Sequence, residues 1–528
     1  MQSKPLTWKR PLTQLMVFAL TLWLLLPQTV WAKGLEANSL PTAPTNLSVK
    51  PYLDRVAQQI TEFTLNNGLK FIVLERHKAP VVSFLTYADV GGADEPTGQT
   101  GIAHFLEHLA FKGTRQIGTR NYTAEQPLLD RLDTLFQQIQ QAQQTGDQAK
   151  VQQLQAEFSR IETEAKQWVV QNEMGQIVNQ SGGVGLNATT SADATRYFYS
   201  FPSNKLELWM SLESERFLDP VFREFYKEKE VILEERRMRT DNSPIGKMVE
   251  VFLDKAFTTH PYRRPVIGYP QDLRQMSRPN VEAFFKTYYG PSNLTMVVVG
   301  DVNPTDVKRL ANLYFGRFPT QPKPPQVTAT EPPQTDERSV TVSLPSQPWY
   351  LEGYHRPALR HPDNAAYELM TSLLSDGRTS RLYKALVEEQ QVALNAEGQN
   401  GFPGDKYPNL LLFYALTAPG HTVEEVATAL NREIERLKTE PVSATELERV
   451  QNQARASLLR SLASNDGMAR LLAEYEIKTG SWRNLFRELE AIAAVTPADL
   501  QRVAQITFVP TNRTVGKLLS TPPTGSKS

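Results

Sequence analysis

The sequence predicts an α+β protein of two similar tandem domains, with a helical hairpin inserted into the first. Segments that alternate apolar and polar residues, as strands do, are interspersed with segments whose apolar residues recur every three or four positions, as in helices. A pattern around residue 290 returns around residue 510, which indicates a duplication. At about 150 residues per domain, a chain of 528 residues has room for two to four domains.

Composition excludes several classes of protein. Lys plus Arg and Asp plus Glu both number 57, so the net charge is zero, whereas a nucleic-acid-binding protein usually has a basic excess. We therefore expect no nucleic-acid partner. The hydrophobic fraction of 40% is that of a globular protein, which excludes wholesale disorder and a multi-span membrane protein. Because the chain has no cysteine, disulfides and thiolate metal sites are excluded, and a metal would need His, Asp or Glu ligands.

The N-terminus has the pattern of a targeting segment. Three basic residues within the first ten positions precede an apolar run over 15–26, and a sequence suited to a cleavage site ends at Ala32. This order is typical of a secretory signal peptide, here 1–32, followed by a polar leader at 33–55. An uncleaved anchor is the alternative, although the apolar run is shorter than the roughly 20 residues of a membrane span. In both cases we expect an exported protein, periplasmic or secreted.

The first domain, expected over 56–318, mixes strands and helices. Residues 61–74 alternate apolar and polar side chains around Asn67-Gly68, a turn signal that predicts a β-hairpin. The other expected elements are a strand at 81–90, a helix at 101–111, helices near 204–217 and 220–240, and a buried strand at 294–299.

Residues 123–172 differ from their surroundings. They are rich in Gln, Glu and Ala, and their apolar residues recur at steps of three and four on both sides of a break at Thr145-Gly146-Asp147. Such spacing is typical of amphipathic helices. We therefore predict an antiparallel helical hairpin that is inserted into the first domain.

The second half repeats the first. A helix, a Pro-x-Asn turn and an apolar strand occur around Pro291 and again around Pro510, with corresponding positions 219 residues apart throughout. Between the copies, residues 319–337 hold six prolines and no periodic pattern, which is typical of an interdomain linker. We expect the second domain over 338–528.

The segment His104-Phe-Leu-Glu107-His108 carries the most specific chemical signal. On a helix, two histidines four residues apart lie on one face, about 5–6 Å apart at Cβ, which lets both imidazoles bind one zinc ion. Glu107 lies near the same face and is suited to take a proton from a zinc-bound water. The H-x-x-E-H order is that of the inverted zincins.

A catalytic zinc ion needs a third protein ligand and an open fourth position. The acidic run at 228–235 supplies candidates, although such a run is more commonly a solvated helix face. Glu228 and Glu235 are seven residues apart, hence on one face, and Val231 and Ile232 between them suggest that the helix is partly buried. One carboxylate would bind zinc and the other would support the site from behind. A structural zinc, with the hairpin as a docking coiled coil, is disfavoured because structural sites usually have four protein ligands.

At this point the chain resembles the pitrilysin/insulinase family of zinc peptidases, on the side of the mitochondrial processing peptidase and its bacterial exported relatives. The resemblance runs from about Phe63 to the C-terminus. It rests on the string from Gly101 to Thr114, on Asn187-Ala188-x-Thr190 with Asp193-x-Thr195-x-Tyr197, on the run from Glu228 to Glu235, and on Gly377-x-x-Ser380-Arg381-Leu382.

The resemblance implies a fold and a set of roles. The fold is two similar tandem domains of the mitochondrial processing peptidase type, each a mostly antiparallel sheet packed with helices. The implied roles are one zinc ion on His104, His108 and Glu235, Glu107 as general base, Glu228 as supporting carboxylate, and Asn187 and Ala188 as the backbone that pairs with an extended peptide.

The chain departs from the family pattern in two ways. The 127 positions from His108 to Glu235 exceed the usual spacing, and the hairpin accounts for the excess. Full active sites in the family also receive an Arg and a Tyr, seven residues apart, but the aligned positions here are Val387 and Leu394, which cannot donate hydrogen bonds. We therefore expect a second homologous subunit to supply that pair. A misalignment, in which Arg381 and the nearby Tyr383 confuse the register, is the alternative.

These observations together predict an exported zinc metalloendopeptidase that acts on peptides or unfolded polypeptides. The alternative is a binding or assembly subunit that keeps the peptidase fold without proteolysis. The intact H-x-x-E-H string favours the enzyme.

Overall fold

A computed structural model describes residues 50–521 of the chain. The predicted signal peptide and most of the predicted leader lie outside the described residues. The expectation of a loose leader up to residue 55 is wrong at its end, because helix α1 (Lys50–Gln58) forms there and buries Leu53 and Val56. Among the described helices, none combines the length and apolar character that a membrane crossing requires.

The first half contains a six-stranded sheet in the order β1-β2-β6-β3-β5-β4. Neighbouring strands are antiparallel except for β2 and β6, which run parallel. The strands are β1 (Ile60–Thr64), β2 (Lys70–Glu75), β3 (Val81–Ala88), β4 (Val184–Thr190), β5 (Thr195–Pro202) and β6 (Leu294–Gly300). The edge strand β4 is the one that comes nearest to the candidate site.

Local sequence explains the centre and the hairpin of this sheet. All seven residues of β6 are buried, as its mostly apolar sequence predicts for a central strand. The β1–β2 hairpin forms around the predicted turn, where Gly68 adopts a φ of +95°. The side-chain amide of Asn67 donates to the carbonyl oxygen of Phe315 (2.8 Å), which fastens the turn to the end of a helix.

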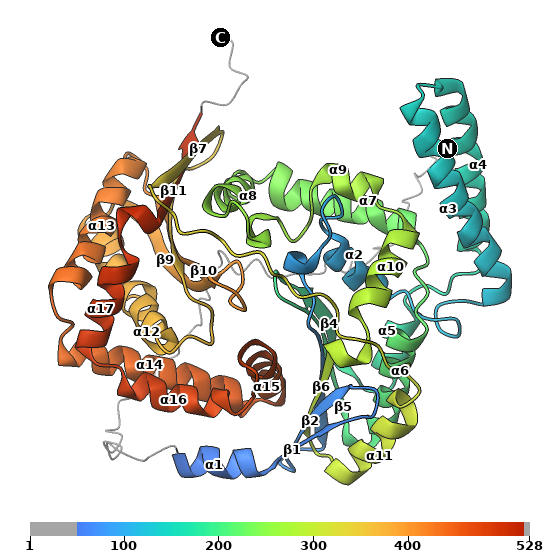
Figure 1. Ribbon diagram of the computed structural model, residues 1–528, viewed down its shortest axis with the longest axis horizontal. Helices are drawn as coiled ribbons and strands as arrows, with labels where there is room; N and C mark the ends of the chain where they lie inside the picture. Colours follow the sequence, from blue (N-terminus) through green and yellow to red (C-terminus); the bar gives the residue numbers. More distant parts are fainter. Residues whose placement is uncertain (1–49, 522–528) are drawn as a thin grey trace, which may run out of the picture. The chain divides into compact units, whose positions relative to one another are not determined.

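Helices cover the sheet of the first half (Figure 1). The helices of this half are α2 (Ile102–Leu109), α5 (Glu173–Gln180), α6 (Leu206–Leu218), α7 (Phe225–Arg236), α8 (Pro244–Ala256), α9 (Pro270–Gln275), α10 (Arg278–Tyr288) and α11 (Pro304–Phe315). Of these, α8 packs against the sheet of the second half instead. The expected helices near 204–217 and 220–240 are α6 and α7, and a π-helical turn, η3 (Arg237–Asp241), extends the latter.

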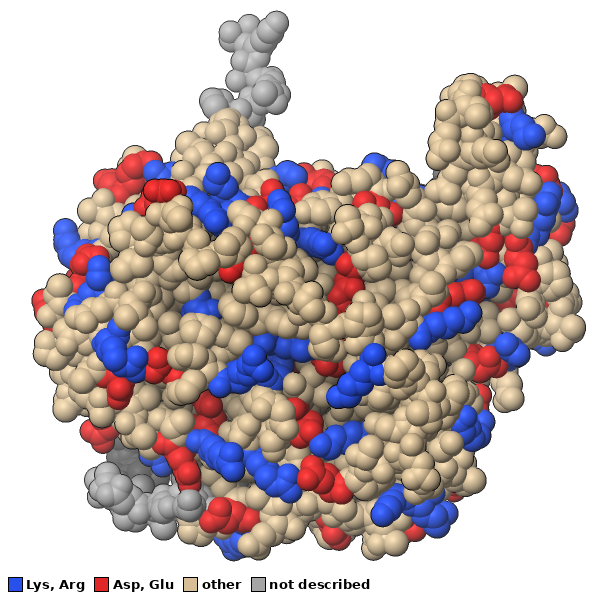
Figure 2. Space-filling model, in the orientation of Figure 1, with Lys and Arg blue, Asp and Glu red and all other residues tan. Residues whose placement is uncertain are grey.

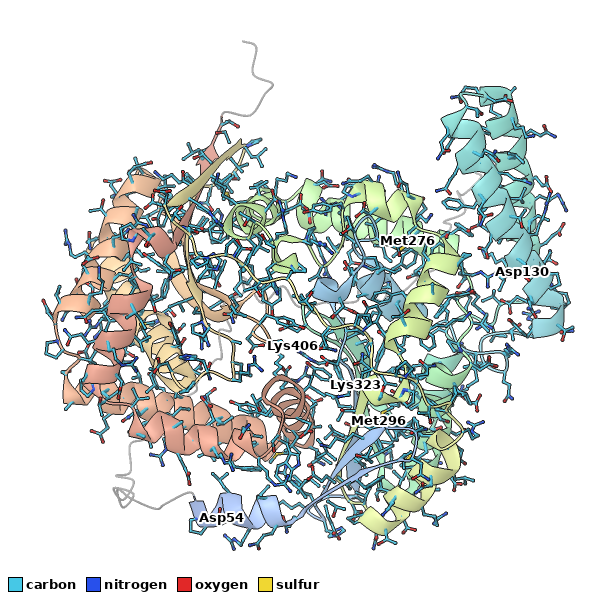
Figure 3. The ribbon with its side chains drawn as sticks, in the orientation of Figure 1. Asp54, Asp130, Met276, Met296, Lys323 and Lys406 are labelled. Atoms are coloured by element: carbon cyan, nitrogen blue, oxygen red, sulfur yellow. The ribbon has the colours of Figure 1, made fainter. Side chains whose placement is uncertain are left out.

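The predicted helical insertion is present as α3 (Tyr122–Gln144) and α4 (Gln148–Lys166), which lie side by side in Figure 1. The hairpin has a core of its own, formed by Leu132, Leu135, Ile139, Ala142, Val151, Leu154, Ile161 and Ala165. Two ion pairs connect the base of the hairpin to the rest of the first domain. One is fully buried and joins Arg223 Nε to Glu125 Oε1 (3.0 Å). The other lies at the surface between Arg278 and Asp130 (2.7 Å; Asp130 is labelled in Figure 3).

The second half repeats the arrangement of the first. Its five-stranded sheet has the order β7-β11-β8-β10-β9, with β7 and β11 parallel, which matches β2-β6-β3-β5-β4 strand for strand. Its strands are β7 (Arg338–Leu344), β8 (Trp349–Arg356), β9 (Ala393–Phe402), β10 (Asn409–Thr417) and β11 (Arg513–Ser520). Its helices are α12 (Asn364–Ser375), α13 (Val423–Thr439), α14 (Ala444–Ala463), α15 (Asn465–Thr479), α16 (Asn484–Ala494) and α17 (Pro497–Thr507).

The repeat found in the sequence is therefore a structural one. Helix α17 begins 219 positions after α10 (residue 497 against 278), and β11 begins 219 positions after β6 (residue 513 against 294). The predicted fold class, two similar α+β domains with mostly antiparallel sheets and a helical hairpin in the first, is confirmed.

The proline-rich segment between the halves forms no helix or strand over 319–337. It is nevertheless fastened to the first half, since the Glu331 carboxylate accepts hydrogen bonds from the backbone N–H groups of Thr258, Thr259 and His260 at 2.8–3.0 Å. On the face shown in Figure 2, acidic and basic side chains are interspersed, as expected for a chain without net charge.

Candidate metal centre

Helix α2 carries the two histidines and is set rigidly in place. Gly101, which precedes it, adopts a φ of +87° and leaves no room for a side chain, because a Cβ there would lie 2.7 Å from the carbonyl oxygen of Ile267. The buried Glu95 carboxylate accepts hydrogen bonds from the N–H groups of Gly101 (2.8 Å) and Ala103 (3.0 Å). Two of the free donors at the helix start are thus satisfied, which orients His104 and Glu107.

Helix α7 contributes the acidic residues and packs beside α2. Glu228 and Glu235 are buried, whereas Glu230 and Glu234 between them are exposed. The acidic run is therefore divided between two faces of one helix. The buried face carries the two carboxylates that are seven residues apart.

The structure brings His104, His108 and Glu235 together. Their ligand atoms all lie within 4.8 Å of one another. Glu235 Oε2 is 3.7 Å from His104 Nε2 and 3.5 Å from His108 Nε2, and the two imidazole rings are nearly perpendicular, at 80°.

This spacing fits a tetrahedral zinc ion. Two ligand atoms at about 2.0–2.1 Å from such an ion are about 3.3–3.4 Å apart. The separations at Glu235 are slightly wider and too long for hydrogen bonds, so three buried or half-buried polar atoms face one another without bonding. The second oxygen of Glu235 lies 2.9 Å from Nη2 of Arg239, which turns Oε2 towards the histidines.

The ring environments also suit metal binding. Burial lowers the pKa of His104 well below its ordinary value, and the neighbouring His108 charge lowers it further, so this ring is neutral, the form that binds metals. Burial acts to lower the pKa of His108 as well, but its hydrogen bond to Glu228 and the nearby carboxylates raise it above the ordinary value. A cation bound to the His108 ring would compete with the proton that this raised pKa favours.

Glu228 lies behind His108 instead of facing the metal position. His108 Nδ1–H donates to Glu228 Oε1 (3.0 Å), and Lys112 Nζ pairs with Oε2 (2.6 Å). Burial acts to raise the pKa of Glu228, but these two partners outweigh it and lower the pKa to about 2. The carboxylate–imidazole pair is the arrangement that fixes the tautomer of a metal-binding histidine.

Glu107 lies beside this group, 3% exposed, and its Oε2 accepts a hydrogen bond from the Thr190 hydroxyl (2.5 Å). Burial raises the pKa of its carboxyl, which the Thr190 bond and the His108 charge partly offset. A raised pKa makes a carboxylate a better proton acceptor near neutral pH.

Asn187 and Ala188 lie on β4, at the free edge of the first sheet. The strand is irregular between Val184 and Asn187, and the Ala188 N–H donates to the Asn187 side-chain oxygen (2.9 Å). An edge strand has unpaired backbone groups that can bind an extended chain. A peptide bound here would compete with the hydrogen bond between the Ala188 N–H and the Asn187 side chain.

The positions aligned with the family's Arg and Tyr carry apolar side chains. Val387 lies in the π-helical segment η6 (Tyr383–Glu389) and packs against the core of the second half, and Leu394 on β9 is 49% exposed. Arg381 is buried and bonded twice to the carboxylate of Glu446 (3.0 and 3.1 Å), so it is already engaged in the fold.

Lys112, Thr190 and Arg239 contact the site, yet sequence reasoning assigned none of them a role. Lys112 and Thr190 stand inside the motifs that carry the resemblance, which was a usable signal. Arg239 stands four residues after Glu235, one helical turn, and only the placement of α7 gives that spacing a meaning.

Comparisons with known proteins identify the family of this chain. The family model described as insulinase (peptidase family M16) matches residues 70–129 and 164–269, and the model described as the peptidase M16 inactive domain matches residues 275–454. The chain belongs to the M16 family. The break in the first match, between 129 and 164, covers most of the α3–α4 hairpin, which is therefore an insertion relative to the M16 family model.

Individual M16 relatives are similar over nearly the whole chain. The zinc protease PqqE of Helicobacter pylori is 28% identical over 493 residues, which is 91% of this chain and 96% of that protein. A probable mitochondrial-processing peptidase subunit beta of Arabidopsis thaliana is 24% identical over 84% of this chain and 75% of its own length. The crystal structure of a protease from Helicobacter pylori superposes with a TM-score of 0.74 at 28% identity, covering 87% of this chain and 99% of that one.

Proposed function

We propose that this protein is a zinc-dependent metalloendopeptidase, with one zinc ion held by His104, His108 and Glu235. The convergence of two imidazoles from α2 and one carboxylate from α7, 127 positions from His108, is the observation that carries the proposal. Three protein ligands leave a fourth position open, as in catalytic zinc sites. The names of the relatives as zinc proteases support the same choice of metal.

The residues of the chain divide the reaction between them. A zinc ion at this site would lower the pKa of a water molecule towards about 7 and polarise the scissile carbonyl. Glu107 takes the proton of the attacking water and returns it to the leaving nitrogen. Glu228 holds the His108 ring in its orientation through Nδ1.

The free edge of β4 is suited to hold the substrate. A peptide that adds to this edge at Asn187 and Ala188 would lie as an extended strand, with backbone hydrogen bonds that are independent of its side chains. This mode favours peptides and unfolded polypeptides, which have an extended segment to offer. The predicted signal sequence supports a reaction outside the cytoplasm.

The chain lacks a donor for the developing oxyanion at the positions where the family has one. We propose that a second homologous subunit supplies the Arg and Tyr that Val387 and Leu394 do not provide. The apolar contacts of Val387 and the engagement of Arg381 with Glu446 support this over a shift in alignment. Loss of one such donor typically costs about 10²–10³ in kcat.

The test compares variants for zinc content and for cleavage of a peptide library, with and without the candidate partner chain. Glu107→Gln is expected to keep zinc and lose hydrolysis, whereas His108→Ala is expected to lose zinc. Full activity in Glu107→Gln would refute the mechanism. Full-rate cleavage by the purified chain alone would refute the need for a partner.

A second candidate function is a binding or assembly subunit without proteolysis. The match of the second half to an inactive-domain model and the apolar residues at 387 and 394 favour it. Zinc stoichiometry separates the two candidates, because a subunit of that kind has no need of a loaded metal site.

A further inference from the structure

Thr190 ends strand β4 and contacts the candidate general base. Its hydroxyl donates to Glu107 Oε2 at 2.5 Å, and within residues 50–521 this is the one hydrogen bond that the Glu107 carboxylate receives. The bond occupies one carboxylate oxygen and leaves Oε1 to accept a proton. The neighbouring Thr189 points to the other face of the strand, and its buried hydroxyl has no hydrogen-bond partner. The contact with Glu107 is therefore specific to Thr190.

The turn that follows Thr190 is held by its own hydrogen bonds. Thr190 pairs with Thr195 across β4 and β5, and the N–H of Ser191 donates to the carbonyl oxygen of Ala194 (2.8 Å). The Ser191 hydroxyl oxygen accepts from the N–H groups of Asp193 (3.3 Å) and Ala194 (3.1 Å). Thr190 therefore has little freedom to move away from Glu107.

A loop of the first half holds the turn from one side. The N–H groups of Gly92 and Ala93 donate to the carbonyl oxygens of Ser191 (3.1 Å) and Ala192 (2.9 Å). The approach is so close that a Cβ at Gly91 would lie 2.5 Å from the Ser191 carbonyl oxygen.

The second half holds the turn from the other side. The Asp193 carboxylate, 1% exposed, accepts hydrogen bonds from the N–H groups of Asp405 (2.8 Å) and Lys406 (3.0 Å) of the second half. It also accepts one from the Tyr262 hydroxyl of the first half (2.5 Å). Lys406, labelled in Figure 3, also pairs with Asp89 of the first half (2.5 Å). The contact between Thr190 and Glu107 is thus fixed by both halves of the chain.

We propose that Thr190 is a positioning residue, whose hydroxyl holds the Glu107 carboxylate in the orientation that accepts a proton from the attacking water. Thr190 also connects the proposed peptide-binding edge of β4 to Glu107. A peptide bound at β4 would therefore lie beside a general base that is already oriented. This inference rests on the proposed peptidase function.

The experiment compares Thr190→Val, which keeps the shape and removes the hydroxyl, with Thr190→Ser, which keeps the hydroxyl. Thr189→Val is the matched control on the same strand. Thr190→Val is expected to lower kcat for a library-selected peptide about 10–100-fold, the worth of a hydrogen bond to a charged acceptor, with KM and zinc content unchanged. Thr190→Ser and Thr189→Val are expected to stay close to the wild type.

A crystal structure of each zinc-loaded variant gives a readout that does not depend on activity. The Glu107 carboxylate is expected to turn away from its wild-type position in Thr190→Val and to keep it in Thr190→Ser. If Thr190→Val does not fold, Thr190→Ala replaces it. An unmoved carboxylate, or an equal loss of kcat in Thr190→Ser, would overturn the proposal. A wild type that binds zinc and cleaves nothing even with the candidate partner chain present would instead refute the peptidase function, while the carboxylate positions would still decide the role of Thr190.

Discussion

Replacing Glu228 by glutamine tests how much of the metal affinity depends on the carboxylate behind His108. Glu228 is 9% exposed, accepts from His108 Nδ1 at 3.0 Å and pairs with Lys112 at 2.6 Å. Glutamine keeps the shape and one acceptor oxygen but removes the charge that makes the imidazole a stronger ligand and that neutralises Lys112. Loss of such a supporting carboxylate typically weakens metal binding about 10–100-fold. That factor corresponds to about 1.4–2.8 kcal/mol.

The assay is a zinc titration in competition with a fluorescent chelator at neutral pH. Glu230→Gln is the matched control, because Glu230 is exposed on the same helix two residues further on. Thermal unfolding of the zinc-free proteins shows whether the fold itself has suffered. Equal zinc affinity in the Glu228→Gln and Glu230→Gln variants would refute the supporting role.

Two further predictions concern stability. Arg223→Met is expected to lower the free energy of unfolding by about 3–5 kcal/mol, because it leaves the fully buried Glu125 without its partner, and the addition of Glu125→Leu should restore part of the loss. Urea unfolding measures both, and an equal loss in the single and double variants would contradict the reasoning. The pKa of Glu331 is about 2, since three backbone N–H donors outweigh the effect of burial. A folded pKa below the unfolded value means that the stabilisation is complete above about pH 4.5 and is lost as the pH falls towards 2. Glu331→Gln should therefore flatten the fall in unfolding free energy over that range, whereas an unchanged slope would show that the contact contributes nothing.

Much of the architecture could be read from local patterns. The β1–β2 hairpin follows from Asn67-Gly68, and the α3–α4 hairpin follows from apolar steps of three and four with a break at Gly146, because both depend on neighbours in the chain. The duplication was visible for a similar reason, since the same helix, turn and strand recur at a constant offset. The order of strands in the sheets was not predictable in this way, because pairing such as β2 with β6 joins residues more than two hundred positions apart.

The sequence by itself determined the half of the candidate site that lies on one helix. His104, Glu107 and His108 share a face of α2 because four residues make about one helical turn, and no tertiary contact is needed for that. Residue spacing left open which carboxylate faces the histidines; the family resemblance implied Glu235, and the tertiary structure supplies the physical reason. Glu228 and Glu235 lie on the same side of α7, and only the packing of α7 against α2 places the second beside both imidazoles and the first behind one. It also decided the contact of Thr190 with Glu107, which joins a strand to a helix 83 positions away, a distance over which side-chain periodicity carries no information.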